Sequence, residues 1–429
     1  MLFFNRHNVL LLTSALLLTF FSSCQTPGKS DPPKEEIFNA PAWFTDRGNL
    51  AQTASINEEA RLPLKVRWER VLPHAIDAPP AGGHGKLYVG SGKTLYALNP
   101  QNGQTVWSYA GDGFDTANPI RRSVTAVAWD KNQQQYVLLV DGMSNLHAIN
   151  GENGTQIWKV VGDGTRASAP VSASQYVFYS VFKNNLGTDY KVLSLQDGAL
   201  KWKFLLGAFD STTTPVHGFG SIFLGDCSNG NYPLRRIEDT ANLLKWRFYD
   251  SEQFNSGLCH SNGVLNMDVA LGEAPVYYFG HHNPPIVRAL NVTSGQQLWS
   301  KNLPQNSDVL GFALTQQREK NDLIVALSDA LFSLNLTNGE ILWQVNFAKN
   351  SISPVNNGGA QVPQPVIWGD YVFHVTGNNV LKAFELATGQ ETWSFTLDQE
   401  TFSSPIVGGN SLYIGTGSGR VYALSPESP

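Results

Sequence analysis

The chain is poor in charge and in helical periodicity, and both shortages exclude a class of protein. Charged residues make up 15% of the 429 residues, and a formal net charge of −5 leaves no basic stripe for a nucleic-acid backbone. Few stretches show the period of a helix, while glycine is frequent, at 39 residues, as is typical of short strands joined by tight turns. The composition therefore argues against nucleic-acid partners and against a helical bundle.

Tryptophan, by contrast, recurs in phase. Seven times an aliphatic-rich strand runs through a turn containing Gly or Asn into a tryptophan, at Trp107, Trp158, Trp202, Trp246, Trp299, Trp343 and Trp393. The spacings of 51, 44, 44, 53, 44 and 50 residues match four-stranded propeller blades and exceed most helical repeats. The repeat predicts an all-β propeller.

The ends of the repeat predict how the ring closes. After Trp393 the chain makes one more half unit, which ends in the strand 421–424, and Trp68 has no matching unit upstream. The Trp68 strand can therefore complete the C-terminal blade and leave no unpaired edge between the two ends. Counting Trp68 with the other tryptophans predicts eight blades over residues 64–429, with seven as the alternative.

The repeated tryptophans are predicted to be structural. An indole at one fixed point of each blade can cover the turn glycine of its own unit and a strand of the next blade, burying on the order of 150–250 Å². Such contacts would form a girdle around the ring, and we expect this role in preference to ligand stacking.

The first 24 residues have the pattern of an export signal. Arg6 and His7 precede an apolar run, residues 9–21, that is too short for a comfortable membrane span. The ending Phe-Ser-Ser-Cys at 21–24 resembles the bacterial lipobox, in which Cys24 would become the lipidated first residue of the mature protein. An ordinary signal peptide is the alternative.

Residues 25–63 are predicted to be a flexible tether. The stretch is polar and rich in proline near its start, with too little apolar surface to fold. Within it, the segment from Trp43 to Thr53 carries two aromatics and a turn signal, so we expect it to pack on the propeller.

With Cys24 assigned to lipid, two cysteines remain. Cys227 and Cys259 lie 32 residues apart and fall, by the phase of the repeat, in adjacent blades. An oxidising compartment permits a disulfide between them, and two buried free thiols are the alternative.

Three eleven-residue units, at 97–107, 289–299 and 383–393, resemble the PQQ-type propeller repeat, A-L-D-x-x-T-G-x-x-x-W. That repeat is shared by quinoprotein dehydrogenases, by outer-membrane assembly lipoproteins of the BamB type and by other exported proteins, so it leaves function open. The segment 43–53 also resembles the lead-in before the first blade in several of these proteins, with Gly48 and Thr53 the best-kept positions.

One function that this resemblance allows is a PQQ-dependent dehydrogenase. Such enzymes resemble one another in an adjacent Cys-Cys pair, a calcium site and a catalytic Asp, but this chain has no Cys-Cys dipeptide and no acidic cluster that aligns with the metal site. Asp115, Asp226 and Asp268 are individual candidates that are more simply explained as turn or strand-end residues. His281 and His282 could bind a metal, but a packing loop is favoured. We expect no catalytic residue, no metal, and neither PQQ nor calcium as a cofactor.

The prediction is instead a non-catalytic, protein-binding scaffold of the BamB type. The resemblance implies a monomeric lipoprotein anchored in the bacterial outer membrane, on its periplasmic or surface face, with a β-barrel assembly protein as a partner. A propeller that binds polysaccharide or another ligand at the cell surface is the alternative.

Overall fold

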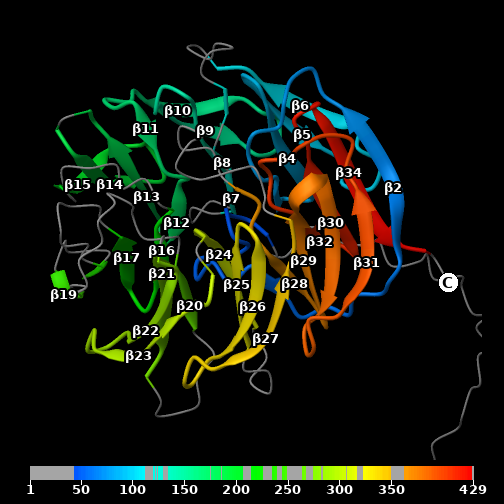
Figure 1. Cartoon of the computed structure of the whole chain (residues 1–429). Coiled ribbons are helices and arrows are strands. Elements are labelled where there is room, and N and C mark those ends of the chain that lie inside the picture. The colour runs from blue at the N-terminus through cyan, green and yellow to red at the C-terminus, as the bar shows by residue number, and fades with distance from the viewer. Residues whose placement is uncertain are drawn as a thin grey trace, which may run out of the picture. The chain divides into compact units, whose positions relative to one another are not determined.

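The regular secondary structure of the described residues is almost wholly β-strand (Figure 1). Within the ranges that the structure describes, the only helix is a 3-10 turn, η1 (Gly377–Asn379), and no helix there is long and apolar enough to cross a bilayer. The computed structural model describes residues 43–111, 119–120, 122, 124–128, 134–173, 175–184, 186–205, 214–225, 234–238, 244–248, 263–266, 274–281, 284–305, 307–315, 322–348 and 362–427.

The strands follow one another in short runs. In the first half they are β1 (Ser55–Ile56), β2 (Leu64–Val71), β3 (Ala81–Gly83), β4 (Lys86–Ser91), β5 (Thr94–Leu98), β6 (Thr105–Tyr109), β7 (Thr125–Ala128), β8 (Gln135–Val140), β9 (Leu146–Asn150), β10 (Gln156–Val160), β11 (Arg166–Ala167), β12 (Val171–Ala173), β13 (Tyr176–Phe182), β14 (Thr188–Ser194), β15 (Leu200–Leu205), β16 (Val216–Gly218) and β17 (Ser221–Gly225). In the second half they are β18 (Leu234–Glu238), β19 (Leu244–Phe248), β20 (Val264–Asn266), β21 (Val276–His281), β22 (Ile286–Asn291), β23 (Gln297–Asn302), β24 (Val309–Leu314), β25 (Asp322–Leu327), β26 (Ala330–Asn335), β27 (Ile341–Asn346), β28 (Val366–Trp368), β29 (Tyr371–Thr376), β30 (Val380–Glu385), β31 (Glu391–Thr396), β32 (Ile406–Gly408), β33 (Ser411–Gly415) and β34 (Arg420–Pro426).

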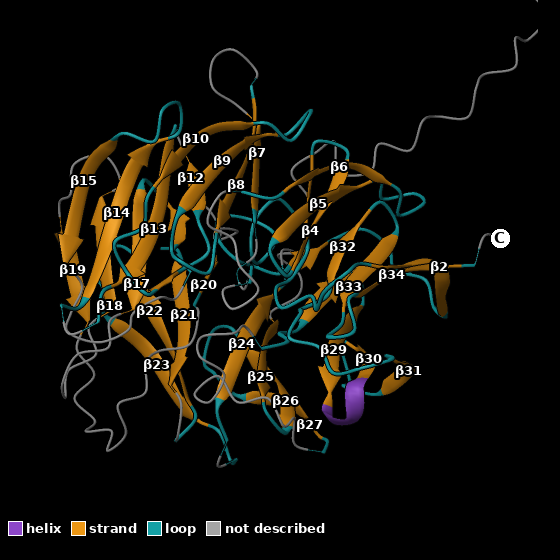
Figure 2. Cartoon of the chain, turned by 90° about the horizontal axis from the view of Figure 1, so that it is seen from above, coloured by secondary structure: helices purple, strands orange, loops and turns teal. Residues whose placement is uncertain are grey.

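Consecutive strands form antiparallel sheets that stand around a ring, which makes the fold an all-β propeller (Figure 2). The innermost strands of neighbouring sheets contact one another in the order β3, β7, β12, β16, β20, β24 and β28. Middle strands such as β25 are buried on both faces and are accordingly almost wholly apolar, whereas outer strands such as β27 alternate between buried and exposed side chains. The sequence pattern therefore decides which strand of a blade faces neighbours and which faces water.

The predicted number of eight blades needs a correction. Seven blades are each built from a continuous run of strands: β3–β6, β7–β10, β11–β15, β16–β19, β20–β23, β24–β27 and β28–β31. The remaining described sheet, β2-β34-β33-β32, is a composite of the two ends of the array, and no continuous stretch builds it. Counting tryptophans gave eight because Trp68 lies on β2, in that composite sheet. The corrected description is seven continuous blades and a composite closing sheet.

The composite sheet brings the two ends of the ring together. β2 pairs antiparallel with β34, and Figure 1 shows the blue strand lying beside the red one. Arg420 reinforces the junction, because its guanidinium reaches Glu69 of β2 at 2.5 Å and Asp398 at 3.1 Å. Lys65 of β2 also pairs with Glu427 beyond the end of β34. Two chain segments far apart in sequence thus close the ring by hydrogen bonds and ion pairs.

Every outer strand that carries a repeat tryptophan has a β-bulge at the residue before it. The register shows one unpaired residue between the tryptophan and the next paired residue on the same strand, and such a bulge re-aims the neighbouring side chains. Bulges also make a strand edge a poorer template for pairing with another chain. The bulged residues are Arg67, Val106, Ile157, Lys201, Lys245, Leu298, Leu342 and Thr392.

Candidate functional site

Residues 43–56, here called the strap, cross the innermost strands of the ring. Four backbone N–H groups, those of His217, Leu265, Leu314 and Ile367, donate to the carbonyls of Leu50, Ala51, Thr53 and Ala54 at 2.8–3.0 Å. These donors come from β16, β20, β24 and β28, one strand from each of four successive blades. The N–H of Gly82 in β3 adds a bond to the carbonyl of Trp43 at 2.8 Å, and β1, at the end of the strap, pairs in parallel with β28. The carbonyls of the strap therefore accept hydrogen bonds from backbone N–H groups of the innermost strands of the ring.

Side chains fix the strap in place. Trp43 is 1% exposed and belongs to the largest hydrophobic cluster of the described residues. Gln52 donates from Nε2 to the carbonyl of Pro215 at 2.8 Å, and the hydroxyls of Thr45 and Thr125 lie 3.0 Å apart. The sequence led us to expect that two aromatics would hold this segment. Side-chain hydrogen bonds hold it as well.

Arg47 is the most unusual side chain of the strap because it is buried, at 3% exposure. Its Nη2 donates to the carbonyl of Pro365 at 2.9 Å and to that of Phe312. Burial lowers the pKa of the guanidinium to about 10, and the neighbouring Asp46 carboxylate opposes the shift. The Asp46 carboxylate in turn accepts a hydrogen bond from the Thr214 hydroxyl at 2.6 Å. Arg47 thus joins two blades by bonding the carbonyls that lead into or lie within their innermost strands.

His374 of β29 lies near this guanidinium and is 1% exposed. Burial, with a further contribution from the charge of Arg47, lowers the pKa of the imidazole to about 3. Its ring packs against Phe347, with centroids 5.6 Å apart. His374 is therefore neutral at physiological pH and acts as a packing residue.

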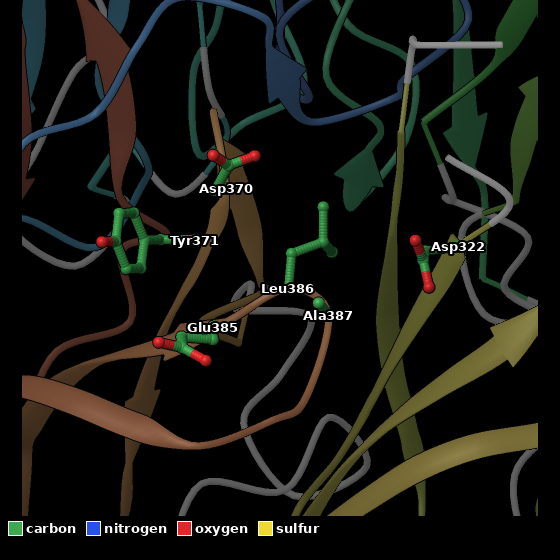
Figure 3. A pocket seen from close by; sticks show the side chains of 6 residues that line it. All are labelled: Asp322, Asp370, Tyr371, Glu385, Leu386 and Ala387. Atoms are coloured by element: carbon green, nitrogen blue, oxygen red, sulfur yellow. The ribbon is translucent and has the colours of Figure 1, made fainter. Parts of the chain in front are cut away.

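A pocket of about 360 Å³ opens between the blade β24–β27 and the blade β28–β31 (Figure 3). Figure 3 shows Asp322 on β25 facing the other five lining residues across the hollow. The lining residues are Asp322, Asp370, Tyr371, Glu385, Leu386 and Ala387.

The chemistry of this pocket suits a cationic or hydroxyl-bearing group. Asp322 accepts a hydrogen bond from Ser333 at 2.8 Å and Glu385 accepts one from Thr388 at 2.9 Å, so local hydroxyls already orient two of the carboxylates. In the part of the chain that is described, no three His, Cys, Asp or Glu side chains are grouped in a way that could hold a metal ion. The sequence did not indicate the pocket, because its residues are spread over some 65 positions on strands that only the fold brings together.

A second buried polar group lies in the blade β7–β10. His147 is placed between Asp141, with Nε2 3.1 Å from Oδ2, and Tyr109, with Nδ1 3.0 Å from the hydroxyl. Burial acts to raise the pKa of Asp141, but hydrogen bonds from His147 and Asn145 outweigh it and hold that pKa below its usual range. The side chains of His147 and Asp141 are fully shielded from solvent. His147 and Asp141 therefore form a buried polar pair, and the partly exposed Tyr109 connects it to Gln156, whose Oε1 accepts a hydrogen bond from the Tyr109 hydroxyl at 2.6 Å.

The repeat tryptophans contact the following blade. In six cases the indole lies over the turn glycine of the next unit and its Nε1 donates to a carbonyl of that turn at 2.8–3.1 Å. The predicted contact with the glycine of the same unit is therefore wrong, because the bulge before each tryptophan turns the indole toward the neighbouring blade. The six pairs are Trp68 with Gly103, Trp107 with Gly154, Trp158 with Gly198, Trp246 with Gly295, Trp299 with Gly339, and Trp343 with Gly389.

The other two tryptophans are placed differently. The turn 239–243, which Trp202 would meet by analogy, lies outside the described residues. Trp393 precedes the composite sheet, which has no repeat turn, and stacks instead on Phe395 with centroids 6.2 Å apart.

Most other candidate residues fall outside the description. These are Cys24, Cys227, Cys259, Asp115, Asp226, Asp268 and His282, together with the side chain of His281. The disulfide between two cysteines, the lipidation of Cys24 and the preference for a packing loop over a metal site at the histidine pair therefore stay predictions.

Comparison with known proteins decides the family. The family model described as "Outer membrane protein assembly factor BamB" matches residues 64–231 and 191–428. The chain belongs to this family. Its fold is a PQQ-like β-propeller that resembles BamB.

Two curated relatives differ in what they do. BamB of Yersinia pestis is 22% identical over 287 residues, which cover 65% of this chain and 66% of that protein. Tetrathionate hydrolase of Acidithiobacillus ferrooxidans is 29% identical over 109 residues, or 25% of this chain and 19% of that enzyme. The chain therefore spans just under two thirds of one relative and about a fifth of the other.

Solved structures with the same fold include an enzyme and a BamB. Quinohemoprotein alcohol dehydrogenase from Comamonas testosteroni has a TM-score of 0.70 at 13% identity, covering 91% of this chain and 82% of that one. BamB from Moraxella catarrhalis has a TM-score of 0.62 at 13% identity, covering 86% and 99%. Likeness at such identities shows the fold alone.

Proposed function

We propose that the chain is a non-catalytic scaffold of the bacterial cell envelope, held at the outer membrane through a lipidated Cys24, that binds protein partners in β-barrel assembly. Membership of the BamB family supports this role. The observation that carries the proposal is the strap: five innermost strands donate backbone hydrogen bonds to it, so the centre of the ring is engaged by the chain itself at that level. A partner would then be bound by the outer surfaces and loops of the ring.

A quinoprotein-like activity is the second candidate, since dehydrogenases share the fold. The strap offers a polycarboxylate quinone one buried cation, Arg47, whose Nη2 is committed to two carbonyls and whose Nη1 has no hydrogen-bond partner among the described residues. His374 is held neutral by burial and adds no second cation beside it. A single buried guanidinium is a poor match for a cofactor with several carboxylates, and we propose that the chain needs neither PQQ nor calcium.

Crosslinking in the native membrane tests the scaffold role. The lipidated full-length chain is crosslinked, recovered and probed with antibodies to a β-barrel assembly protein and to an abundant unrelated barrel. Enrichment of the assembly protein alone supports the proposal, and equal recovery of both barrels contradicts it. Cys24→Ala is the matched variant: the wild-type chain should remain with the outer membrane after a high-salt wash, while the variant should leave it.

The alternatives are read in parallel from purified protein. Saturable PQQ binding that depends on calcium would replace the scaffold with a quinoprotein. Saturable binding of a cell-surface polysaccharide, without recovery of the assembly protein, would favour the ligand-binding propeller.

A further inference from the structure

Three repeat turns carry the dipeptide Asn-Gly at the glycine that a tryptophan covers. Asn-Gly is the pair most prone to deamidation, because glycine has no side chain to hinder attack by its own backbone nitrogen. In each of the three the asparagine is exposed, whereas the glycine is buried beneath the indole. The side chain that would react is therefore open to water, and the nitrogen that would attack it is covered. The pairs are Asn102-Gly103, Asn153-Gly154 and Asn338-Gly339.

Deamidation at such a pair proceeds through the backbone and needs no reactant but water. The glycine nitrogen attacks Cγ of the asparagine, and a bond between these atoms forms as the bond from Cγ to Nδ2 breaks. The proton lost by the glycine nitrogen leaves with Nδ2 as ammonia. Water then opens the resulting succinimide, at Cγ to give aspartate or at the main-chain carbonyl carbon to give isoaspartate. The reaction therefore requires a free glycine nitrogen and a turn that can flatten into a five-membered ring.

In the turn between β26 and β27 neither requirement is met. The N–H of Gly339 donates to the carbonyl of Asn335 at 2.9 Å, so the attacking nitrogen is already bonded. The Oδ1 of Asn338 accepts from the N–H of Glu340 at 3.0 Å, which fixes the orientation of the carboxamide. Loss of the Gly339 proton would leave the Asn335 carbonyl without this donor.

The other two turns repeat these bonds. The glycine N–H donates to the carbonyl four residues before it, at 2.8 Å for Gly103 and 2.9 Å for Gly154. The asparagine Oδ1 accepts from the N–H two residues after it, at 3.0 Å for both Asn102 and Asn153. Turns in three different blades thus hold both reacting groups in the same way.

The tryptophan of the preceding sheet keeps each turn from flattening. Cε3 of Trp299 lies 2.6 Å from the place of a Cβ on Gly339, so the indole rests on the glycine backbone. Its Nε1 donates to the carbonyl of Leu336, in the same turn, at 2.9 Å. Trp68 and Trp107 bond their turns in the same way, at 2.9 and 3.1 Å. Closure of a succinimide would have to displace the indole and break its hydrogen bond.

The two products of the reaction differ in how they fit the turn. Asp197 precedes Gly198 in another covered turn, and its Oδ1 accepts from the N–H of Ala199 at 3.0 Å, so aspartate fits. Isoaspartate adds a methylene to the main chain beside a glycine that has a φ of +71° in the case of Gly339. That insertion would lift the turn away from the indole and so weaken the contact between two blades.

We propose that Asn102, Asn153 and Asn338 are latent deamidation sites, each kept closed by the indole of the preceding sheet. Separation of two neighbouring sheets frees the glycine nitrogen at their junction, and the isoaspartate that follows hinders the junction from closing again. The modification therefore marks the junction that has opened. The proposal does not depend on the scaffold role or on acylation of Cys24.

Peptide mapping of the aged full-length protein tests the protection. The protein is kept in mildly alkaline buffer, either folded or in denaturant, and aspartate and isoaspartate at each asparagine are quantified over time by mass spectrometry. We expect the three turn sites to deamidate many-fold more slowly in the folded protein than in denaturant. Equal rates in the two conditions would overturn the proposal.

Single substitutions separate the effect of one indole from overall stability. Trp299→Phe keeps an aromatic ring but removes the Nε1 donor, so deamidation at Asn338 should quicken several-fold relative to Asn102 and Asn153 in the same molecule. The ratio of rates is the readout, because global unfolding would raise all three together. Trp107→Phe is the matched variant, in which Asn153 alone should respond. Unchanged ratios in both variants would overturn the proposal.

Discussion

The indole of Trp299 lies against Gly339 of the following blade. A Cβ on Gly339 would come within 2.6 Å of Cε3 of the indole, and the Nε1 of Trp299 donates to the carbonyl of Leu336 at 2.9 Å. Gly339 also has a φ of +71°, a conformation that favours glycine. The turn position of Gly339 thus requires a left-handed backbone conformation and the absence of a side chain. It carries the contact between two blades.

The first prediction compares two alanine substitutions. Gly339→Ala should destabilise the protein by about 2–4 kcal/mol, because a left-handed backbone and an overpacked indole both add cost. Gly220→Ala is the matched control: its φ is +60° but nothing lies within 4 Å of the added Cβ, so we expect about 1–2 kcal/mol. Chemical unfolding with both variants measures the difference.

A double mutant separates the contact from the backbone term. Trp299→Ala alone should cost about 3–5 kcal/mol as the loss of a buried aromatic. In that background Gly339→Ala should cost no more than Gly220→Ala, because the clash is gone. Full additivity of the two substitutions would show that the indole does not press on this turn.

The second prediction concerns the strap. Arg47→Met leaves the carbonyls of Phe312 and Pro365 without their donor, and we expect a loss of about 1–3 kcal/mol. The amides of Leu265, Leu314 and Ile367, which bond the strap, should then exchange with solvent faster than in the wild type.

Arg61→Met supplies the control for this measurement. Arg61 pairs with Glu59 on the surface, so its removal should change neither the unfolding midpoint nor the exchange of those amides. If Arg47→Met left the amide exchange unchanged as well, the strap would be held by its backbone bonds alone.

Much of the fold could be predicted because the sequence repeats. The in-phase tryptophans predicted an all-β propeller, and the unmatched Trp68 strand pairs with β34 as the end of the repeat indicated. The direction of the indoles could not be predicted, since it depends on a bulge that only the register between strands reveals. The predicted number of blades was wrong for a related reason, because a tryptophan count does not distinguish a continuous blade from a composite sheet.

The residues of the candidate site could not be predicted in the same way. Arg47 belongs to no repeated motif, and nothing in its local sequence indicates that it is buried among carbonyls of other blades. Asp322 and Glu385 are ordinary strand-end carboxylates until two blades bring them to one pocket.

The third prediction concerns acid. The pKa of His374 falls to about 3 in the folded protein from an ordinary value near 6.5, so between these values the unfolded chain binds a proton that the folded chain does not. Above pH 6.5 the imidazole is neutral in both states and does not affect stability, whereas stability declines as the pH falls from 6.5 toward 3, by at most about 1.4 kcal/mol per pH unit. His374→Gln should flatten this part of the profile relative to the wild type.

Carboxylates titrate in the same window, so the test is the difference between the two profiles and not either alone. Arg47→Met should shift the wild-type profile in the same direction as His374→Gln, but less, because Arg47 is the smaller of the two causes. Parallel wild-type and His374→Gln profiles between pH 3 and 6.5 would mean that the imidazole is not held neutral.

The fourth prediction concerns the closure of the ring. Lys65 of β2 and Ser425 of β34 are register partners, and no chain connection joins these strands directly. A disulfide in K65C/S425C would restrict a very long loop of the unfolded chain, so oxidation should raise the free energy of unfolding by about 2–5 kcal/mol. K382C/S394C, a register pair within one continuous blade, closes a short loop and should gain less on oxidation. Thermal melts of both variants, oxidised and reduced, give the comparison. An equal gain in the two would contradict the dependence on loop length from which the larger gain is expected.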